Sequence, residues 1–133
     1  MTWSADTDID AREILARTVL SAISQAAVDR GASAITVYTT WRQMAYDEIG
    51  SRFASRGYDV GSLTNTAGLL IVEVALALAI LFESASQWLA DGSADIYARK
   101  AEWWRARYAE EMAAVRPSTD RRAEGPTFTW ERG

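Results

Sequence analysis

The sequence predicts an all-α protein: a small four-helix domain with a long hydrophobic central helix and an extended C-terminal tail. Alanine, the residue with the best helix propensity, occurs 24 times in 133 residues. Apolar residues recur at helical spacing in successive segments. Both prolines, Pro117 and Pro126, lie near the C-terminus. We therefore predict a helical domain over residues 1–116 and an extended C-terminal arm over residues 117–133.

The first helix is predicted to begin at Asp10, where Asp10 and Glu13 have the spacing of a capping box. Gly31 is placed to end it in a left-handed conformation. Its apolar stripe comprises Ile14, Leu15, Val19, Leu20, Ile23, Ala26 and Ala27. Asp6, Asp8 and Asp10 also resemble the start of a calcium loop, but the glycine and the terminal glutamate of that loop are absent, so helix capping is the favoured interpretation.

The second helix is predicted after a short, β-branched connection over residues 32–38. Thr40 and Gln43 have the spacing of another capping box, and Gly57 is expected to end the helix. Its buried stripe is predicted to comprise Trp41, Ala45, Ile49 and Phe53. The loop that follows has no repeated glycine signature, so a nucleotide-binding loop is not indicated.

The third helix, from about Thr66 to Leu89, is apolar on every side and must therefore be covered on every side. We expect helices of its own chain to cover part of it and an adjacent copy to cover the rest. The apolar run over residues 67–82 is shorter than a membrane span and contains Glu73, so no membrane contact is expected. As a buried acid, Glu73 is expected to pair with an arginine of a facing helix.

The fourth helix is predicted to start after Asp91-Gly92-Ser93, with Ser93 as its N-cap. Its apolar stripe comprises Tyr97, Ala101, Trp104, Tyr108, Met112 and Val115. Arg107 and Glu111 have the spacing of an ion pair along the helix surface. Trp103 lies beside the stripe, where it could pack in the core or anchor a partner. Pro117 ends this helix.

The C-terminal residues 117–133 differ in composition from the helices, and Thr127, Phe128, Thr129 and Trp130 alternate as in a strand. A lone strand has no partner within a helical protein, so the pattern favours addition to a strand of another protein. The partner-binding residues predicted in this tail are Pro126, Thr127, Phe128, Thr129 and Trp130.

The composition excludes much catalytic chemistry. Without cysteine or histidine the chain can form no disulfide, thiol nucleophile, Ser-His-Asp triad or usual zinc or haem site. We therefore predict no catalytic, cofactor-binding or metal-binding residues, and a protein that is not an enzyme. The net charge of −4 also argues against a protein that coats DNA or RNA.

A short helical domain, a last helix rich in aromatic residues and arginine (residues 97–112), and an extended tail together resemble the head–tail adaptor (connector) proteins of tailed bacteriophages. The resemblance implies a structural protein of the virion neck, made in the cytoplasm of the bacterial host. It implies a ring, dodecameric in that family, beneath the portal protein, with contacts to the portal and to other neck or tail proteins. DNA would pass through the lumen without specific binding.

Two other function classes stay open. A small bacterial helical regulator or antitoxin-like protein could bind a protein partner through the same tail. An enzyme or magnesium site built from carboxylates would need clustered acids, whereas the pairs Asp47-Glu48 and Glu110-Glu111 point to different sides of a helix. A large ring or association with virions would favour the adaptor, and a monomer or dimer would favour the regulator.

Overall fold

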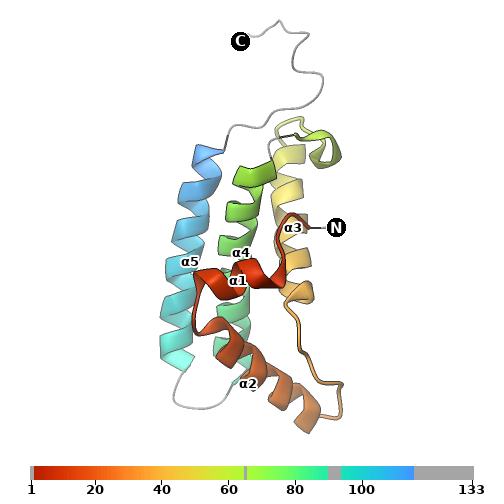
Figure 1. Cartoon of the computed structure of the whole chain (residues 1–133). Helices are drawn as coiled ribbons and strands as arrows, with labels where there is room; N and C mark the ends of the chain where they lie inside the picture. The colour runs from red at the N-terminus through yellow and green to blue at the C-terminus, as the bar shows by residue number, and fades with distance from the viewer. Residues whose placement is uncertain (1, 65, 90–93, 116–133) are drawn as a thin grey trace, which may run out of the picture.

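The computed structural model describes residues 2–64, 66–89 and 94–115, and it confirms an all-α fold for these residues. The helices are α1 (Asp6–Arg12), α2 (Ala16–Asp29), α3 (Thr39–Ala54), the 3₁₀ turn η1 (Val60–Ser62), α4 (Thr66–Trp88) and α5 (Ala94–Ala114). Helix α4 stands between α3 and α5, while α1 and α2 cross it on one side (Figure 1). The predicted Ser93 N-cap and the C-terminal arm lie outside the described residues.

The first predicted helix is in fact two helices, so the described chain has five α-helices rather than four. Helix α1 begins after Ala5, whose backbone N–H donates to the Asp8 side chain at 2.7 Å. It ends at Arg12, and Glu13 has extended backbone geometry. The capping box predicted at Asp10 and Glu13 was therefore wrong, because Glu13 leaves the helix to make buried contacts with α5.

The second predicted helix corresponds to α3, and its stripe of Trp41, Ala45, Ile49 and Phe53 is buried as predicted. Its start differs from the prediction: Tyr38 is the N-cap residue, and no side chain caps the helix. The glycines predicted to end the first two helices do have left-handed backbone, with φ of 89° at Gly31 and 88° at Gly57.

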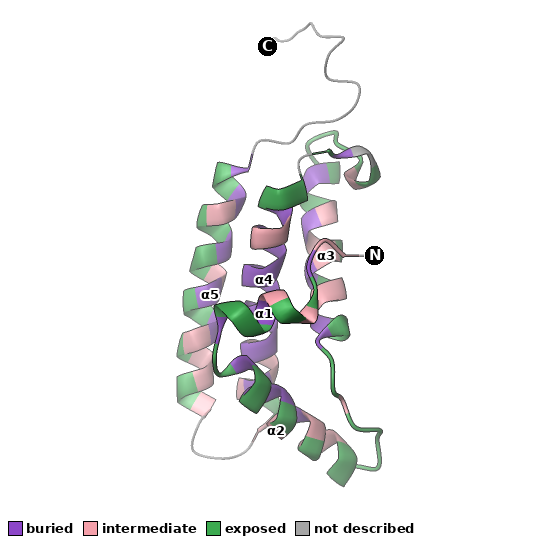
Figure 2. Cartoon of the chain, in the orientation of Figure 1, coloured by how far each residue is buried: buried purple, intermediate pink, exposed green. Residues whose placement is uncertain are grey.

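Helix α4 is the centre of the core. Every residue from 72 to 82 is buried, as the purple ribbon in Figure 2 shows. By length and composition α4 as a whole could cross a membrane, whereas the sequence argument considered only the apolar run over residues 67–82; 67% of the most apolar window of α4 is buried inside the protein.

The cover of residues 72–82 of α4 comes from its own chain. Helices α1, α2, α3 and α5 all pack against it and bury residues 72–82 without a second copy, whereas Leu70 and Ile71 are half-buried, so the covering of part of the helix by an adjacent copy stays a prediction. Two features account for the burial of residues 72–82. Ala75, Ala77 and Ala79 are fully buried and let neighbouring helices approach closely. Arg105 of α5 also forms ion pairs with Glu83 of α4 at 2.9 Å and with Glu48 of α3 at 3.3 Å.

Most of the predicted stripe of α5 is buried. Ala101, Trp104, Tyr108 and Met112 are buried against α4, and Val115 just beyond the helix is buried as well, whereas Tyr97 is only partly buried against the core. The predicted ion pair between Arg107 and Glu111 is present at 3.2 Å. Because the inner face of α5 packs in the core, only its outer face is available to bind other molecules.

Candidate functional site

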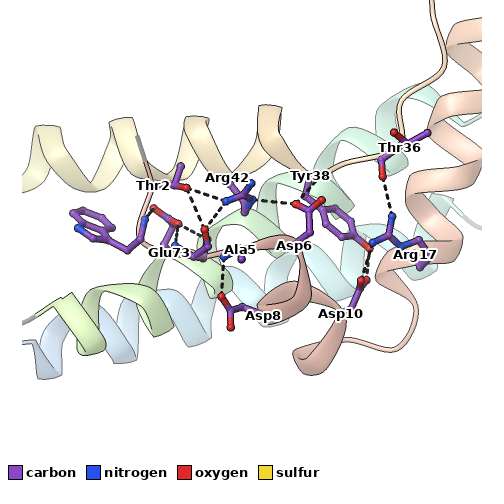
Figure 3. A network of polar contacts seen from close by, with 12 residues as sticks. Thr2, Ala5, Asp6, Asp8, Asp10, Arg17, Thr36, Tyr38, Arg42 and Glu73 are labelled. Atoms are coloured by element: carbon purple, nitrogen blue, oxygen red, sulfur yellow. Dashed lines mark hydrogen bonds and ion pairs between the residues drawn. The ribbon is translucent and has the colours of Figure 1, made fainter.

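The first polar centre of the structure surrounds Glu73. Its side chain is fully buried and accepts hydrogen bonds from the backbone N–H groups of Trp3 (3.2 Å) and Ser4 (2.8 Å), and from the Ser4 hydroxyl. The predicted arginine partner was wrong, because the N-terminal segment, some 70 residues away in sequence, lies along α4 and supplies the donors (Figure 3).

Arg42 of α3 holds the other side of this N-terminal segment. Its guanidinium donates to the Ser4 carbonyl and to the Thr2 hydroxyl (2.9 Å), and it pairs with Asp6 at 3.2 Å (Figure 3). The Trp3 ring also packs on Tyr46, with ring centroids 4.6 Å apart. These contacts fix residues 2–6 across the core, so we assign Glu73 and Arg42 a structural role.

The three aspartates that resemble a calcium loop have separate partners. Asp8 caps the start of α1, Asp6 pairs with Arg42, and Asp10 accepts from Tyr38 (2.7 Å) and Arg17 (2.7 Å). The hydrogen bond from Arg17 is the main cause that lowers the pKa of the Asp10 carboxyl. Within the described ranges, no cluster of three acidic side chains is arranged to hold a metal ion.

The second polar centre is the floor of an open groove between the end of α1 and the N-terminal half of α5. The groove has a volume of about 650 Å³. Its lining residues come from two stretches of sequence: Ala11, Arg12, Glu13 and Ile14, and Arg99, Lys100, Trp103 and Trp104. We call it the Trp103 groove.

Apolar side chains are unusually exposed in the Trp103 groove. Ile14 is 88% exposed and Trp103 is 57% exposed. The Trp103 ring meets the buried Trp104 ring edge-on, with centroids 4.7 Å apart, which supports its outward position. A large exposed aromatic next to an exposed aliphatic side chain is typical of a protein-binding surface.

Glu13 joins the two walls of the groove. Its carboxylate, 6% exposed, accepts from the Lys100 ammonium at 2.8 Å and from the Trp104 indole N–H at 3.1 Å. Burial by itself raises the pKa of Glu13, but the hydrogen bonds from Lys100, Trp104 and the Leu15 backbone outweigh it and leave the pKa below its usual value. At the floor of the groove, the ionised Glu13 carboxylate is therefore fully occupied by its partners and is not a reactive group.

The groove is positively charged, although the protein is negatively charged. Arg12, Arg99 and Lys100 line it against one carboxylate, that of Glu13, which gives a local charge of three minus one, or +2. The whole chain has a net charge of −4. Among the described residues, Arg12 and Arg99 form no ion pair with an acidic side chain, and both are exposed.

The acid sensitivity of this contact is our first prediction. Because the pKa of Glu13 is lowered in the folded state, its stabilisation is complete above the unfolded value of about 4.3 and is lost as pH falls through the folded value. Urea unfolding should therefore show wild type exceeding Glu13→Gln in stability at pH 7, with the difference shrinking between about pH 5 and pH 3. Glu110→Gln, at a site 73% exposed, is the matched control and should change stability little. A constant difference for Glu13→Gln would contradict the prediction.

Of the predicted partner-binding residues, the structure describes Trp103. It is exposed beside the α5 stripe and lines the groove, and its role as a partner anchor stays a prediction. Pro126, Thr127, Phe128, Thr129 and Trp130 lie outside the described residues. Sequence reasoning missed Ile14, which it assigned to a buried stripe, because the break between α1 and α2 turns this residue outward. It also gave no role to Arg12 and Arg99, which resemble other scattered arginines in the sequence.

Comparison with known protein families, with curated proteins and with solved structures finds no match for this chain. The interpretation of the site therefore depends on its geometry. That geometry consists of an exposed aromatic anchor, a basic rim and a fully partnered polar floor. It is suited to binding another macromolecule.

Proposed function

We propose that this protein is a head–tail adaptor of a tailed bacteriophage, a structural subunit of the virion neck that is not an enzyme. In this proposal its copies form a dodecameric ring beneath the portal protein, contact other neck or tail proteins, and surround the path of the genome. The proposal combines the resemblance of residues 97–112 and of the tail with the geometry of α5.

The observation that carries the proposal is the outward face of α5 at Trp103. The inner stripe of α5 is used by the core, yet a tryptophan 57% exposed remains on its outer side, beside the exposed Ile14. An aromatic of this size in a concave, open setting is the kind of residue that dominates binding energy at protein interfaces. A subunit of a larger assembly needs such a surface.

The charge balance agrees with a conduit for DNA. At a net charge of −4 the protein as a whole repels a polyanion, which lets DNA pass without being retained. The basic Trp103 groove is a local exception to this charge balance. Burial of residues 72–82 within one chain supports a subunit that folds before it assembles.

The test of this function is complementation of a phage or prophage from which the gene for this protein has been deleted. Our second prediction is that full-length protein restores infectious particles, whereas protein lacking residues 117–133 does not, although its helical circular dichroism is unchanged. Trp103→Ala should also lower the particle yield, because it removes an interface anchor. Trp88→Ala, at an exposed site outside the groove, is the control.

Two results would contradict the adaptor proposal. If the truncated protein restores particles at normal yield, the tail is dispensable and the adaptor proposal loses its main support. If native mass measurement gives a monomer or dimer and the protein is absent from purified virions, the helical regulator becomes the better explanation.

A further inference from the structure

We propose that the Trp103 groove binds a negatively charged segment of another protein that carries a large apolar side chain. The apolar side chain would lie against Ile14 and Trp103, and acidic side chains would lie against Arg12 and Arg99. The biological setting of this contact rests on the proposed function, since the partner would then be a neighbouring neck protein. The binding chemistry follows from the groove itself.

Two arginines of the Trp103 groove carry positive charge that the protein itself does not balance. Lys100 forms an ion pair with Glu13 at 2.8 Å, and the Trp104 indole N–H also donates to Glu13. The Lys100–Glu13 pair therefore contributes no net charge to the rim. Arg12 and Arg99 remain, both exposed and without an acidic partner among the described side chains. The neighbouring acid Glu102 lines a different groove, together with Glu83 and Arg105. A ligand with carboxylates would neutralise two charges that the protein leaves unbalanced.

The Trp103 groove is preorganised. The Glu13 contacts with Lys100 and Trp104 connect the end of α1 to α5, so the two walls of the groove are fixed before a ligand arrives. Trp103 is held edge-on by Trp104. A rigid aromatic anchor between fixed walls binds with a small loss of side-chain entropy, and this favours a stable contact over a transient one.

The charge of the C-terminal tail does not match that of the groove. Residues 116–133 contain two aromatic residues that could serve as anchors, but they also contain four arginines against three acidic residues. This segment has no excess of negative charge to offer Arg12 and Arg99. The tail and the Trp103 groove therefore have different partners in our proposal.

A nucleic acid fits the groove less well than an acidic peptide. Phosphates would meet the same arginines, but the surface between them is largely aliphatic and aromatic, and the floor carries the ionised carboxylate of Glu13. A peptide can supply both the carboxylates and the apolar side chain.

The test is fluorescence anisotropy with the full-length protein and three matched, fluorescein-labelled peptides. Each peptide has two leucines in the same positions, and the remaining positions are mainly glutamate, serine or lysine. Our third prediction is that the glutamate peptide binds at least about tenfold more tightly than the serine peptide, and that about 1 M salt removes most of this difference. The lysine peptide should bind most weakly.

Variants assign the binding to the groove. The double variant Arg12→Glu/Arg99→Glu should weaken binding of the glutamate peptide about tenfold, and Trp103→Ala should weaken it about thirtyfold. Arg30→Glu and Trp88→Ala are the matched controls, because both sites are exposed and neither lines the groove. Circular dichroism checks that each variant is folded. If Trp103→Ala is not folded, the charge variants alone decide, since their side chains are exposed.

Three results would overturn the proposal: equal binding of the three peptides, tighter binding of a peptide of residues 117–133, or tighter binding of an oligothymidine that the double arginine variant abolishes. The complementation assay separates this failure from failure of the proposed function. If the peptides bind as expected while the double arginine variant restores normal particle yield, the groove chemistry stands and its role in the phage neck is refuted. If Trp103→Ala blocks assembly while the peptides bind alike, the neck function stands and the acidic ligand is refuted.

Discussion

Replacing Glu73 with alanine is expected to lower the free energy of unfolding by about 3 kcal/mol or more, which is a large part of the stability of a domain of this size. The carboxylate is fully buried and accepts from both the backbone N–H and the hydroxyl of Ser4. Its removal leaves two buried donors without an acceptor, at about 1–3 kcal/mol each. Chemical denaturation followed by circular dichroism measures the loss.

Two companion measurements make the Glu73 prediction specific. Ser4→Ala removes one donor and leaves the carboxylate paired with the two backbone N–H groups, so its cost should be clearly smaller, about 1 kcal/mol. In Glu73→Ala, the amide protons of Trp3 and Ser4 should exchange much faster than in wild type, because the N-terminal segment loses its anchor. Unchanged protection of these two amides would show that Arg42 holds the segment without help from Glu73.

The second large effect is expected at Leu76. This side chain is fully buried at the middle of α4, so Leu76→Ala should cost about 2–5 kcal/mol through lost transfer free energy and the cavity that remains. The same range applies to Ile80→Ala, which is 7% exposed. Ile14→Ala, at a site 88% exposed, should stay within about 0.5 kcal/mol of wild type.

The concentration dependence of the Leu76→Ala effect decides how α4 is covered. Because helices of the same chain enclose residues 72–82, the loss should be the same at low and high protein concentration. If an adjacent copy supplied part of the cover, wild-type stability would rise with protein concentration and the variant would lose that dependence. A concentration-dependent difference would therefore support cover of α4 by an adjacent copy.

The elements with the strongest apolar patterns were the ones that the sequence predicted well. The stripes of α3 and α5 are buried as their spacing indicated, and Gly31 and Gly57 adopt left-handed backbone. The first helix was predicted wrongly because a local pattern competed with a distant one. The spacing of Asp10 and Glu13 favours a helix start, whereas contacts of Glu13 with Lys100 and Trp104, about 90 residues away, bring it into the core.

Local patterns predict some features of the candidate site, whereas contacts between distant segments cannot be read from the sequence. The position of Trp103 beside the α5 stripe is a local property of one helix, and it is visible in the spacing of the sequence. The groove depends on the turn between α1 and α2, which places Ile14 and Arg12 opposite Trp103. The partner of Glu73 likewise comes from a segment whose composition gives no sign that it lies along α4.

The enclosure of α4 also has a consequence for the order in which the protein is made. Helix α4 contains an 18-residue window with a mean hydropathy of 2.1, and it leaves the ribosome before α5, the helix with which it packs most extensively. Until α5 is complete, the nascent chain presents a surface that resembles a membrane segment to chaperones and targeting factors. Helix α5 therefore completes the cover of α4 only at a late stage of synthesis.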